Sequence, residues 1–390
     1  MMKFNFYTRY YLFSVFTSTD FIRGLHIVYL LELGYSNFFT GLCQTLLFVS
    51  ILVFDIPSGF LADKYGNKCV LLFGAISFFA SGLIYLSSTD MFLISLLYML
   101  QGIGFAMYSG SSVSILYNNV QYNEGGDKNF HKYLSRSRQL SNFTLFIAIS
   151  VGSLLYSYSW QVLFLVYVIF QIGTVFSAST LVDSESNYRR RIEKTEDRIT
   201  TIESIRYIFS HKKLLAFIVC IAFLEAAHTP FFVFYQNLLE SKGVEGEYIS
   251  ITIALALLAS SFANLYAPLF KGIALYNLTR ITLIVCLTIC LIHFFDAPSW
   301  FLIPLFICFN AIPHILFIFT DEFINQHFEN SNRATSLSIV SFINSVFISF
   351  TYLILGIVAD NFNASLALII PAGFLVLSLF IATKNKEIFQ

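Results

Sequence analysis

Long apolar runs alternate with short polar breaks along nearly the whole chain. A transmembrane helix needs about 20 apolar residues to cross about 30 Å of hydrocarbon, and many runs reach this length. The pattern predicts twelve membrane-spanning helices, at residues 8–33, 38–62, 69–87, 91–117, 140–158, 160–181, 213–239, 247–270, 278–295, 298–323, 334–358 and 363–383. Two places stay open, because the spans that meet between Tyr158 and Trp160 could be one helix and the span around Pro268 could be broken.

The composition agrees with a protein embedded in a bilayer. Hydrophobic residues make up 57% of the chain and charged residues only 12%, which is too little charge to cover the surface of a soluble protein of this size. Six cysteines lie within or at the ends of the spans with no metal-type spacing, so we interpret them as packing residues. No small-residue cleavage site follows the first apolar run, so we expect a retained helix and not a signal peptide.

The basic residues give the orientation. If both termini are cytoplasmic, all 23 Lys and Arg residues except Arg23 and Lys242 fall on the cytoplasmic side, as the positive-inside rule requires. An odd number of spans would destroy this asymmetry. The net charge of zero therefore hides a strong sidedness, and it gives no support for nucleic-acid binding.

The longest polar stretch divides the spans into six and six. It predicts an N-terminal six-helix bundle at 1–182, a cytoplasmic linker at 183–212 and a C-terminal bundle at 213–390. The spacing of Ile192, Ile199, Ile202 and Ile205 suggests that the linker is a helix on the membrane surface, and a solvated tether is the alternative.

The two halves also resemble each other. A shift of 205 residues places Asp20 on Glu225 and Arg23 on His228, which suggests a duplication of the kind found in six-plus-six transporters. Acid and base are three residues apart in each half, so we expect each pair on one helical face.

A polar stretch between the second and third spans, GFLADKYGNK, carries a family resemblance. It resembles the G-x-L-A-D-[RK]-x-G-[RK]-[RK] pattern of the major facilitator superfamily, and the matching residues are Gly59, Leu61, Ala62, Asp63, Lys64, Gly66 and Lys68. The resemblance implies an all-α membrane fold of two pseudo-symmetric bundles, alternating access, a functional monomer and a bacterial inner membrane. It also implies that this stretch is a gating loop, which Asp55 could join; a turn that only sets topology is the alternative.

The chain departs from the exporter patterns of that family at two places. In LLYMLQGIGFA of the fourth span, Gln101, Gly102 and Gly104 match the proton-coupled exporters, but Tyr98 stands where they have arginine. The fifth-span antiporter pattern is reduced to Gly152. The resemblance therefore supports the fold more strongly than it supports antiport.

Ionisable residues inside the spans are the candidates for coupling. A charge at the bilayer centre costs about 2.5 to 3.5 kcal/mol on insertion scales, so such residues default to functional roles. We predict Asp20 or Glu225 as the proton carrier, with Arg23 as its charge partner or as an anchor for an anionic substrate group. A static buried ion pair is the alternative. His228, before Pro230, is a candidate proton relay or a packing residue.

Polar residues of the fourth and tenth spans are candidates for lining a cavity. They are Tyr98, Gln101, Tyr108, Ser112, Asn310 and His314, and the last two share a helical face. Small residues at such spacing equally serve close helix contact. The abundance of Phe and Tyr suits an amphipathic organic ligand. We expect Asp321 and Glu322 to pair with basic loop residues near the cytoplasmic mouth.

These observations favour secondary active export of a small amphipathic compound, such as a drug, an antibiotic or peptide-like metabolite, or a siderophore, by proton antiport. Uptake of a nutrient or metabolite on the same scaffold is the alternative. Titratable candidates favour protons over sodium without excluding a sodium site. The loops contain no phosphate-binding glycine loop, metal motif or nucleophile elbow, so we expect neither an enzyme nor a cofactor or metal.

Overall fold

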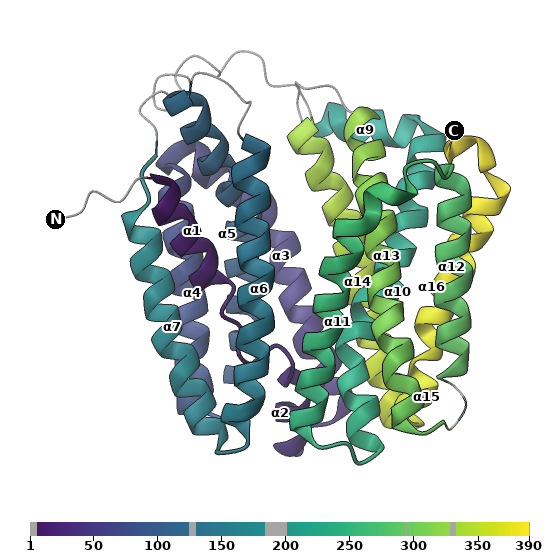
Figure 1. Ribbon diagram of the computed structural model, residues 1–390, viewed down its shortest axis with the longest axis horizontal. Coiled ribbons are helices and arrows are strands. Elements are labelled where there is room, and N and C mark those ends of the chain that lie inside the picture. Colours follow the sequence, from purple (N-terminus) through teal and green to yellow (C-terminus); the bar gives the residue numbers. More distant parts are fainter. Residues whose placement is uncertain are drawn as a thin grey trace. The chain divides into compact units, whose positions relative to one another are not determined.

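A computed structural model describes residues 6–124, 130–183, 201–293, 295, 297–327 and 333–389 (Figure 1). These residues are almost entirely helical, and no β-strand occurs among them. Their contacts group the chain into two compact units. Unit 1 comprises residues 1–23 and 46–197, and unit 2 comprises residues 24–45 and 198–390.

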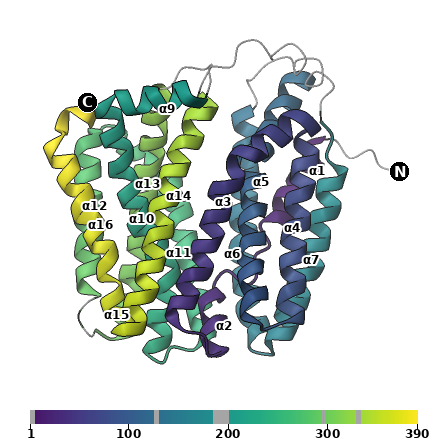
Figure 2. The same ribbon diagram turned by 180° about the vertical axis from the view of Figure 1, so that it is seen from behind.

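Unit 1 is a bundle of antiparallel helices. It contains α1 (Phe6–Thr17), most of α3 (Asn37–Tyr65), α4 (Asn67–Ser87), α5 (Met91–Glu124), α6 (Phe130–Tyr156) and α7 (Trp160–Thr180). Helix α4 packs against α5 and α7, and α1 packs against α6 and α7 (Figure 2). Apolar side chains of α1, α4 and α5, among them Phe13, Leu71 and Ile115, are buried together in one cluster.

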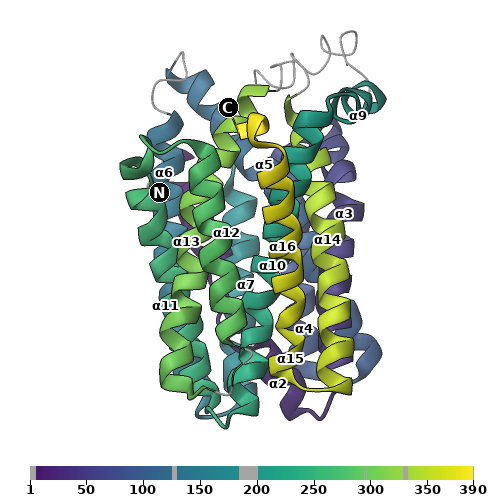
Figure 3. The ribbon, with the colours of Figure 1, turned by 90° about the vertical axis from the view of Figure 1, so that its right-hand side faces the viewer.

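Unit 2 is a second bundle, with α2 (His26–Glu32) and the first turns of α3 added from the first half of the chain. Its other helices are α9 (Thr201–Ser210), α10 (Lys212–Ser241), α11 (Gly246–Tyr266), η1 (Ala267–Phe270), α12 (Leu275–Ile292), α13 (Ser299–His327), α14 (Arg333–Asn361), α15 (Ala364–Ala367), α16 (Ile369–Lys384) and η2 (Lys386–Phe389). Helix α10 packs against α14 and α16, α12 against α16, and α11 against α13 (Figure 3). Of the predicted linker, 184–200 lie outside the described residues, and α9 is helical as expected.

Eleven of the described helical segments are long and apolar enough to cross a membrane, and they coincide with the second to twelfth predicted spans. The two open places are now resolved. Helix α6 ends at Tyr156 and α7 begins at Trp160, so two helices are present. The span through Pro268 continues from α11 into the short 3-10 helix η1.

The prediction of one continuous first span is wrong. Helix α1 ends at Thr17, α2 begins at His26, and residues 18–25 between them are not helical. The hydroxyl groups of Thr17, Ser18 and Thr19 donate to backbone carbonyls three or four residues earlier. Clustered hydroxyl side chains that bond to the nearby backbone compete with the helical pattern, which explains the break.

The 24–45 segment is fastened to helices from the second half of the chain. The N–H of Ile27 donates to Oε1 of Gln236 at 3.0 Å. The N–H groups of Asn37 and Phe38 donate to the Asp360 carboxylate at 2.7 and 2.8 Å. These bonds join residues more than 200 positions apart, so the segment belongs to unit 2 by direct hydrogen bonding as well as by packing.

The polar stretch GFLADKYGNK is mostly helix, so the prediction of a loop there is wrong. Helix α3 continues to Tyr65, α4 begins at Asn67, and only Gly66 lies between them. Gly66 has φ +97°, a left-handed conformation that glycine adopts without strain, and it alone makes the turn. Gly59 lies inside α3 with open space around it. The side chain of Asp63 lies outside the described part of the chain.

Candidate functional site

Polar side chains gather inside the spans of unit 2, where α10 and α13 face each other. Glu225, His228 and Thr229 lie on α10, and Asn310 and His314 lie on α13. Both helices contain proline in this region. A proline lacks the N–H that would bond to the carbonyl four residues earlier, so it loosens the helix locally.

Glu225 accepts a hydrogen bond from its own helix and lies within electrostatic reach of a second acid. The Thr229 hydroxyl, one turn further along α10, donates to Oε2 of Glu225 at 3.4 Å. Asp321 on α13 lies close enough for its charge to act on the Glu225 carboxyl. Two nearby carboxylates favour sharing a proton, so the pair suits proton binding.

His228 sits in an aromatic cage that also contains a second histidine. Its side chain is 8% exposed, and its ring centroid lies 5.9 Å from Phe309 and 5.7 Å from Phe317. The His314 ring is 5.6 Å away and nearly perpendicular. The Nε2 atom of His228 is buried and has no hydrogen-bond partner among the described residues. This nitrogen is therefore free to bond to a proton or a ligand.

The two candidates of the tenth predicted span, Asn310 and His314, make different contacts in the structure. Asn310 is almost fully buried, and its amide donates to the Phe306 carbonyl of its own helix at 3.0 Å. His314, one turn later, contacts His228 instead. The Asn310 side chain therefore bonds within its own helix while its backbone is hydrogen-bonded to His228, and the His314 ring packs beside His228.

In unit 1 the expected pair of Asp20 and Arg23 does not lie on a helical face. Both residues are in the non-helical segment 18–25, so that prediction is wrong. Asp20 lies near the Tyr167 hydroxyl on α7, which is hydrogen-bonded to Ser81 and Gln101. The acid is therefore placed beside a buried polar network that involves three helices.

Gly152 explains how the non-helical segment fits against α6. A Cβ atom at this position would collide with the backbone carbonyl of Phe21. The residue that sequence comparison marks as the remnant of the antiporter pattern thus permits close approach of two backbones.

The fourth-span candidates are packed inside unit 1. Tyr98 is fully buried, and Ser112 is hydrogen-bonded to the Tyr10 hydroxyl. The Tyr108 ring lies 5.5 Å from Phe13 and 5.4 Å from Phe78. Its hydroxyl is buried without a hydrogen-bond partner in the described part of the chain.

The residues expected to form the gate lie at the end of α3. Oδ1 of Asp55 accepts a hydrogen bond from the Ser109 hydroxyl of α5 at 2.9 Å. Lys64 is exposed and its Nζ lies 5.0 Å from the centroid of the Tyr65 ring. The backbone N–H of Lys68 donates to Asp183 at 3.2 Å. These contacts all lie within unit 1.

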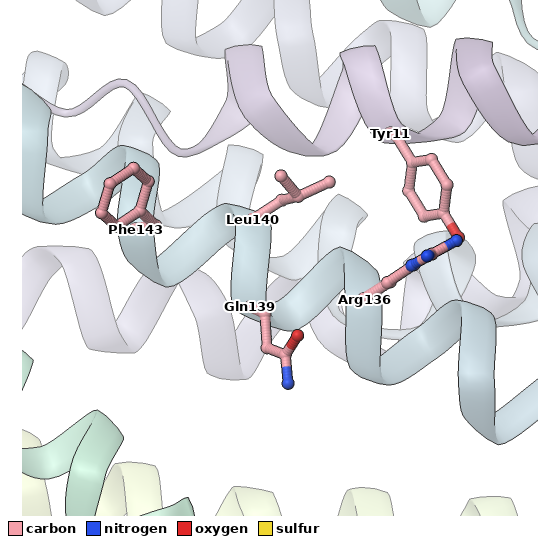
Figure 4. Close-up of a pocket in the computed structure, with 5 residues that line it drawn as sticks. All are labelled: Tyr11, Arg136, Gln139, Leu140 and Phe143. Carbon is pink, nitrogen blue, oxygen red and sulfur yellow. The ribbon is translucent and has the colours of Figure 1, made fainter.

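A pocket of about 460 Å³ opens between α1 and α6 of unit 1 (Figure 4). It is lined by Tyr11, Arg136, Gln139, Leu140 and Phe143. Sequence reasoning missed it because residues 118–139 were assigned to a loop, and Arg136 was counted only as a topology signal. The signal was present, since the four α6 residues are spaced i, i+3, i+4 and i+7 as on one helical face.

The comparisons with known proteins agree with this architecture. The sequence model of the Major Facilitator Superfamily matches residues 5–321. The MFS-type transporter YxaM of Bacillus subtilis (strain 168) is 25% identical over 395 residues, which cover 96% of each chain.

Two solved structures share the fold. A mutant of the nucleoside transporter NupG has a TM-score of 0.82 at 16% identity and covers 99% of this chain and 100% of its own. A D-xylose–proton symporter has a TM-score of 0.74 at 13% identity and covers 96% of each chain. The family match, the full-length relative and the shared fold together show that this chain is an integral membrane transporter of the Major Facilitator Superfamily.

Proposed function

We propose that the chain is a proton-coupled secondary transporter that moves a small organic compound by alternating access. The observation that carries this proposal is the cluster of Glu225, His228 and His314 inside the spans of unit 2, together with the nearby Asp321. Ionisable groups within transmembrane helices mark ion pathways and proton relays. The cluster contains both carboxyl and imidazole groups, which bind and release protons.

Within this proposal, Glu225 binds the coupling proton and His228 passes it on. The buried Nε2 of His228 supports this role, since it has no hydrogen-bond partner among the described residues and lies beside a second imidazole. Asp20 and Arg23 lie in non-helical backbone, which is tolerated at membrane depth where it is buried in protein or lines a water-filled cavity. We assign this segment to the path of the solute.

Export by proton antiport is our first candidate for the direction. It is supported by the exporter-like sequence around Gly59 to Lys68 and by Gln101, Gly102 and Gly104 in the fourth span. We place the protein in a bacterial cytoplasmic membrane as a monomer with both termini inside. The placement of all but two basic residues on one side supports this orientation.

Uptake by proton symport is the second candidate. Tyr98 stands where the proton-coupled exporters have arginine, and it is fully buried. One of the similar solved structures is a proton symporter, and the likeness to it concerns the fold.

Reconstituted vesicles with an acidic interior test the coupling. We would record a pH-sensitive dye inside proteoliposomes while a panel of amphipathic compounds is added, for the wild type and for Glu225→Gln. The expected result is solute-dependent proton efflux in the wild type that Glu225→Gln abolishes. Glu247→Gln, in the first turn of α11 and away from the cluster, is the matched control. Proton flux that persists in Glu225→Gln would refute its role.

The same vesicles give the direction. With an acidic interior, an antiporter drives the solute inward as protons leave, whereas a symporter drives the solute outward together with the protons. The sign of solute movement therefore decides between export and uptake, whichever way the protein is inserted. The absence of any solute-dependent proton movement with a transported solute would exclude proton coupling.

A further inference from the structure

The pocket between α1 and α6 has one polar end and one apolar end. The polar end consists of the Arg136 guanidinium and the Tyr11 hydroxyl, and the Gln139 amide points away from them in Figure 4. Figure 4 shows the Arg136 side chain extending to the Tyr11 hydroxyl, with Leu140 and Phe143 further along α6. Phe143 is 61% exposed and Leu140 is 38% exposed. The pocket thus combines hydrogen-bond donors with uncovered apolar surface.

The charge of Arg136 is not neutralised by a neighbouring acid in the described part of the chain. No ion pair with a carboxylate occurs for it there, although it lies within the candidate span Lys132–Tyr156. A guanidinium stays protonated in proteins and offers five N–H donors. Arg136 is an exposed residue in the second turn of α6, so an anionic ligand can reach its guanidinium.

The Tyr11 hydroxyl is the immediate neighbour of this guanidinium. It is buried, and the Arg136 side chain reaches it and is its hydrogen-bonding neighbour, as Figure 4 shows. A guanidinium has only donors, so the Tyr11 oxygen is the acceptor in this contact and keeps its own O–H as a donor. A ligand oxygen placed between this hydroxyl and the guanidinium would bond to both groups.

We propose that this pocket binds the carboxylate of an amphipathic aromatic acid, and that such acids are the substrate class of the transporter. The planar guanidinium of Arg136 matches the two oxygens of a carboxylate, which is the geometry of the strongest charge-assisted pairs. Tyr11 donates to one of these oxygens, and the aromatic body lies against Leu140 and Phe143. The substrate assignment rests on the proposed transport function, whereas binding at the pocket does not.

The size of the pocket agrees with this ligand class. About 460 Å³ lies within the range of about 300 to 1,000 Å³ that is usual for small-molecule sites. A bicyclic aromatic acid fits such a volume, and 2-naphthoate is therefore a suitable probe. Its neutral counterpart, 2-naphthamide, has almost the same shape without the charge.

Equilibrium binding to the purified full chain in lipid nanodiscs tests the pocket. We expect wild type to bind radiolabelled 2-naphthoate and to bind 2-naphthamide more weakly. Arg136→Gln should weaken naphthoate binding at least about tenfold while changing naphthamide binding less than about twofold. Phe143→Ala should weaken the binding of both compounds, because it removes apolar contact and leaves the Arg136 charge in place.

Two further variants keep the test decisive. Arg136→Lys keeps the charge but loses the planar, forked arrangement of N–H donors. Its affinity for naphthoate should therefore lie between those of wild type and Arg136→Gln. It replaces the glutamine variant in the test if that variant does not fold. Arg138→Gln removes an equal charge from an exposed position on the same helix outside the pocket, and it should bind naphthoate like wild type. Absence of naphthoate binding to wild type, or equal losses in the Arg136 and Arg138 glutamine variants, would overturn the proposal.

The proton-flux assay separates this proposal from the proposed function. If naphthoate binding depends on Arg136 but naphthoate moves no protons, the binding site stands and naphthoate is not a coupled substrate. If another compound moves protons through Glu225 while naphthoate does not bind, the transport function stands and this pocket assignment is wrong.

Discussion

Asp360 connects the last turn of α14 to the first turn of α3, and its removal should loosen the 24–45 segment. Its carboxylate accepts hydrogen bonds from the backbone N–H groups of Asn37 and Phe38, at 2.7 and 2.8 Å. The first N–H groups of a helix have no partner within the helix, and that end carries a partial positive charge. Asp360→Asn removes the charge and turns one acceptor oxygen into a donor that faces an N–H group.

The expected loss can be worked out from these contacts. Hydrogen bonds to a charged group are worth about 1.5 to 3 kcal/mol each when shielded, but here the groups are exposed to solvent, which weakens them. Loss of a helix-capping carboxylate typically costs about 1 kcal/mol, and we adopt that value. About 1 kcal/mol corresponds to about a fivefold change in the local opening equilibrium.

Hydrogen exchange followed by mass spectrometry measures this change. Amides 37 and 38 should exchange about fivefold faster in Asp360→Asn than in wild type. Asp90 provides the matched control, because its carboxylate caps the helix that follows it in sequence, with Oδ1 accepting from Phe92 at 2.9 Å. Asp90→Asn should speed exchange at the start of α5 only. Unchanged exchange at 37 and 38 in Asp360→Asn would refute the reasoning.

Three further predictions concern stability. Gly152→Ala should lower the melting temperature, because its methyl group meets the Phe21 carbonyl and overpacking costs about 1 to 3 kcal/mol, whereas Gly110→Ala, at an open helical position, should not. Tyr108→Phe removes a buried hydroxyl without a partner in the described structure, so the melting temperature should stay equal or rise. Burial lowers the pKa of His293, just beyond α12, so the folded state keeps it neutral. Stability should therefore fall as the pH drops below about 6.5, where the unfolded chain takes up the proton. His293→Gln should reduce this dependence of the melting temperature on pH.

Most spans could be predicted because length and apolarity alone define a membrane helix. The break in the first span could not be predicted, since it depends on the hydroxyl groups of Thr17, Ser18 and Thr19 bonding to the nearby backbone. The polar stretch after Gly59 was assigned to a loop because it contains charges. Charged residues are nevertheless compatible with a helix, and only the positive φ of Gly66 requires a turn.

The candidate site was predictable within one helix and not between helices. Sequence spacing placed Glu225 and His228 three residues apart on one helix, and the continuous α10 agrees. The contact between His228 and His314 depends on the packing of α10 against α13, which no local spacing fixes. Arg136 was missed for a different reason, since helix α6 begins about ten residues before the predicted span.

The two residue pairs that a shift of 205 positions aligns have different surroundings in the structure. Glu225 and His228 lie on a helix that stays continuous through Pro230, and their side chains interact with groups on α13. Asp20 and Arg23 lie in backbone that has left the helix, against an α6 whose Gly152 admits it closely. Helical backbone satisfies its own hydrogen bonds in a membrane, whereas non-helical backbone depends on its surroundings and changes conformation when they change. We therefore expect the copy in the second half to carry the proton and the copy in the first half to respond to the solute, which is the division of labour that coupled transport requires.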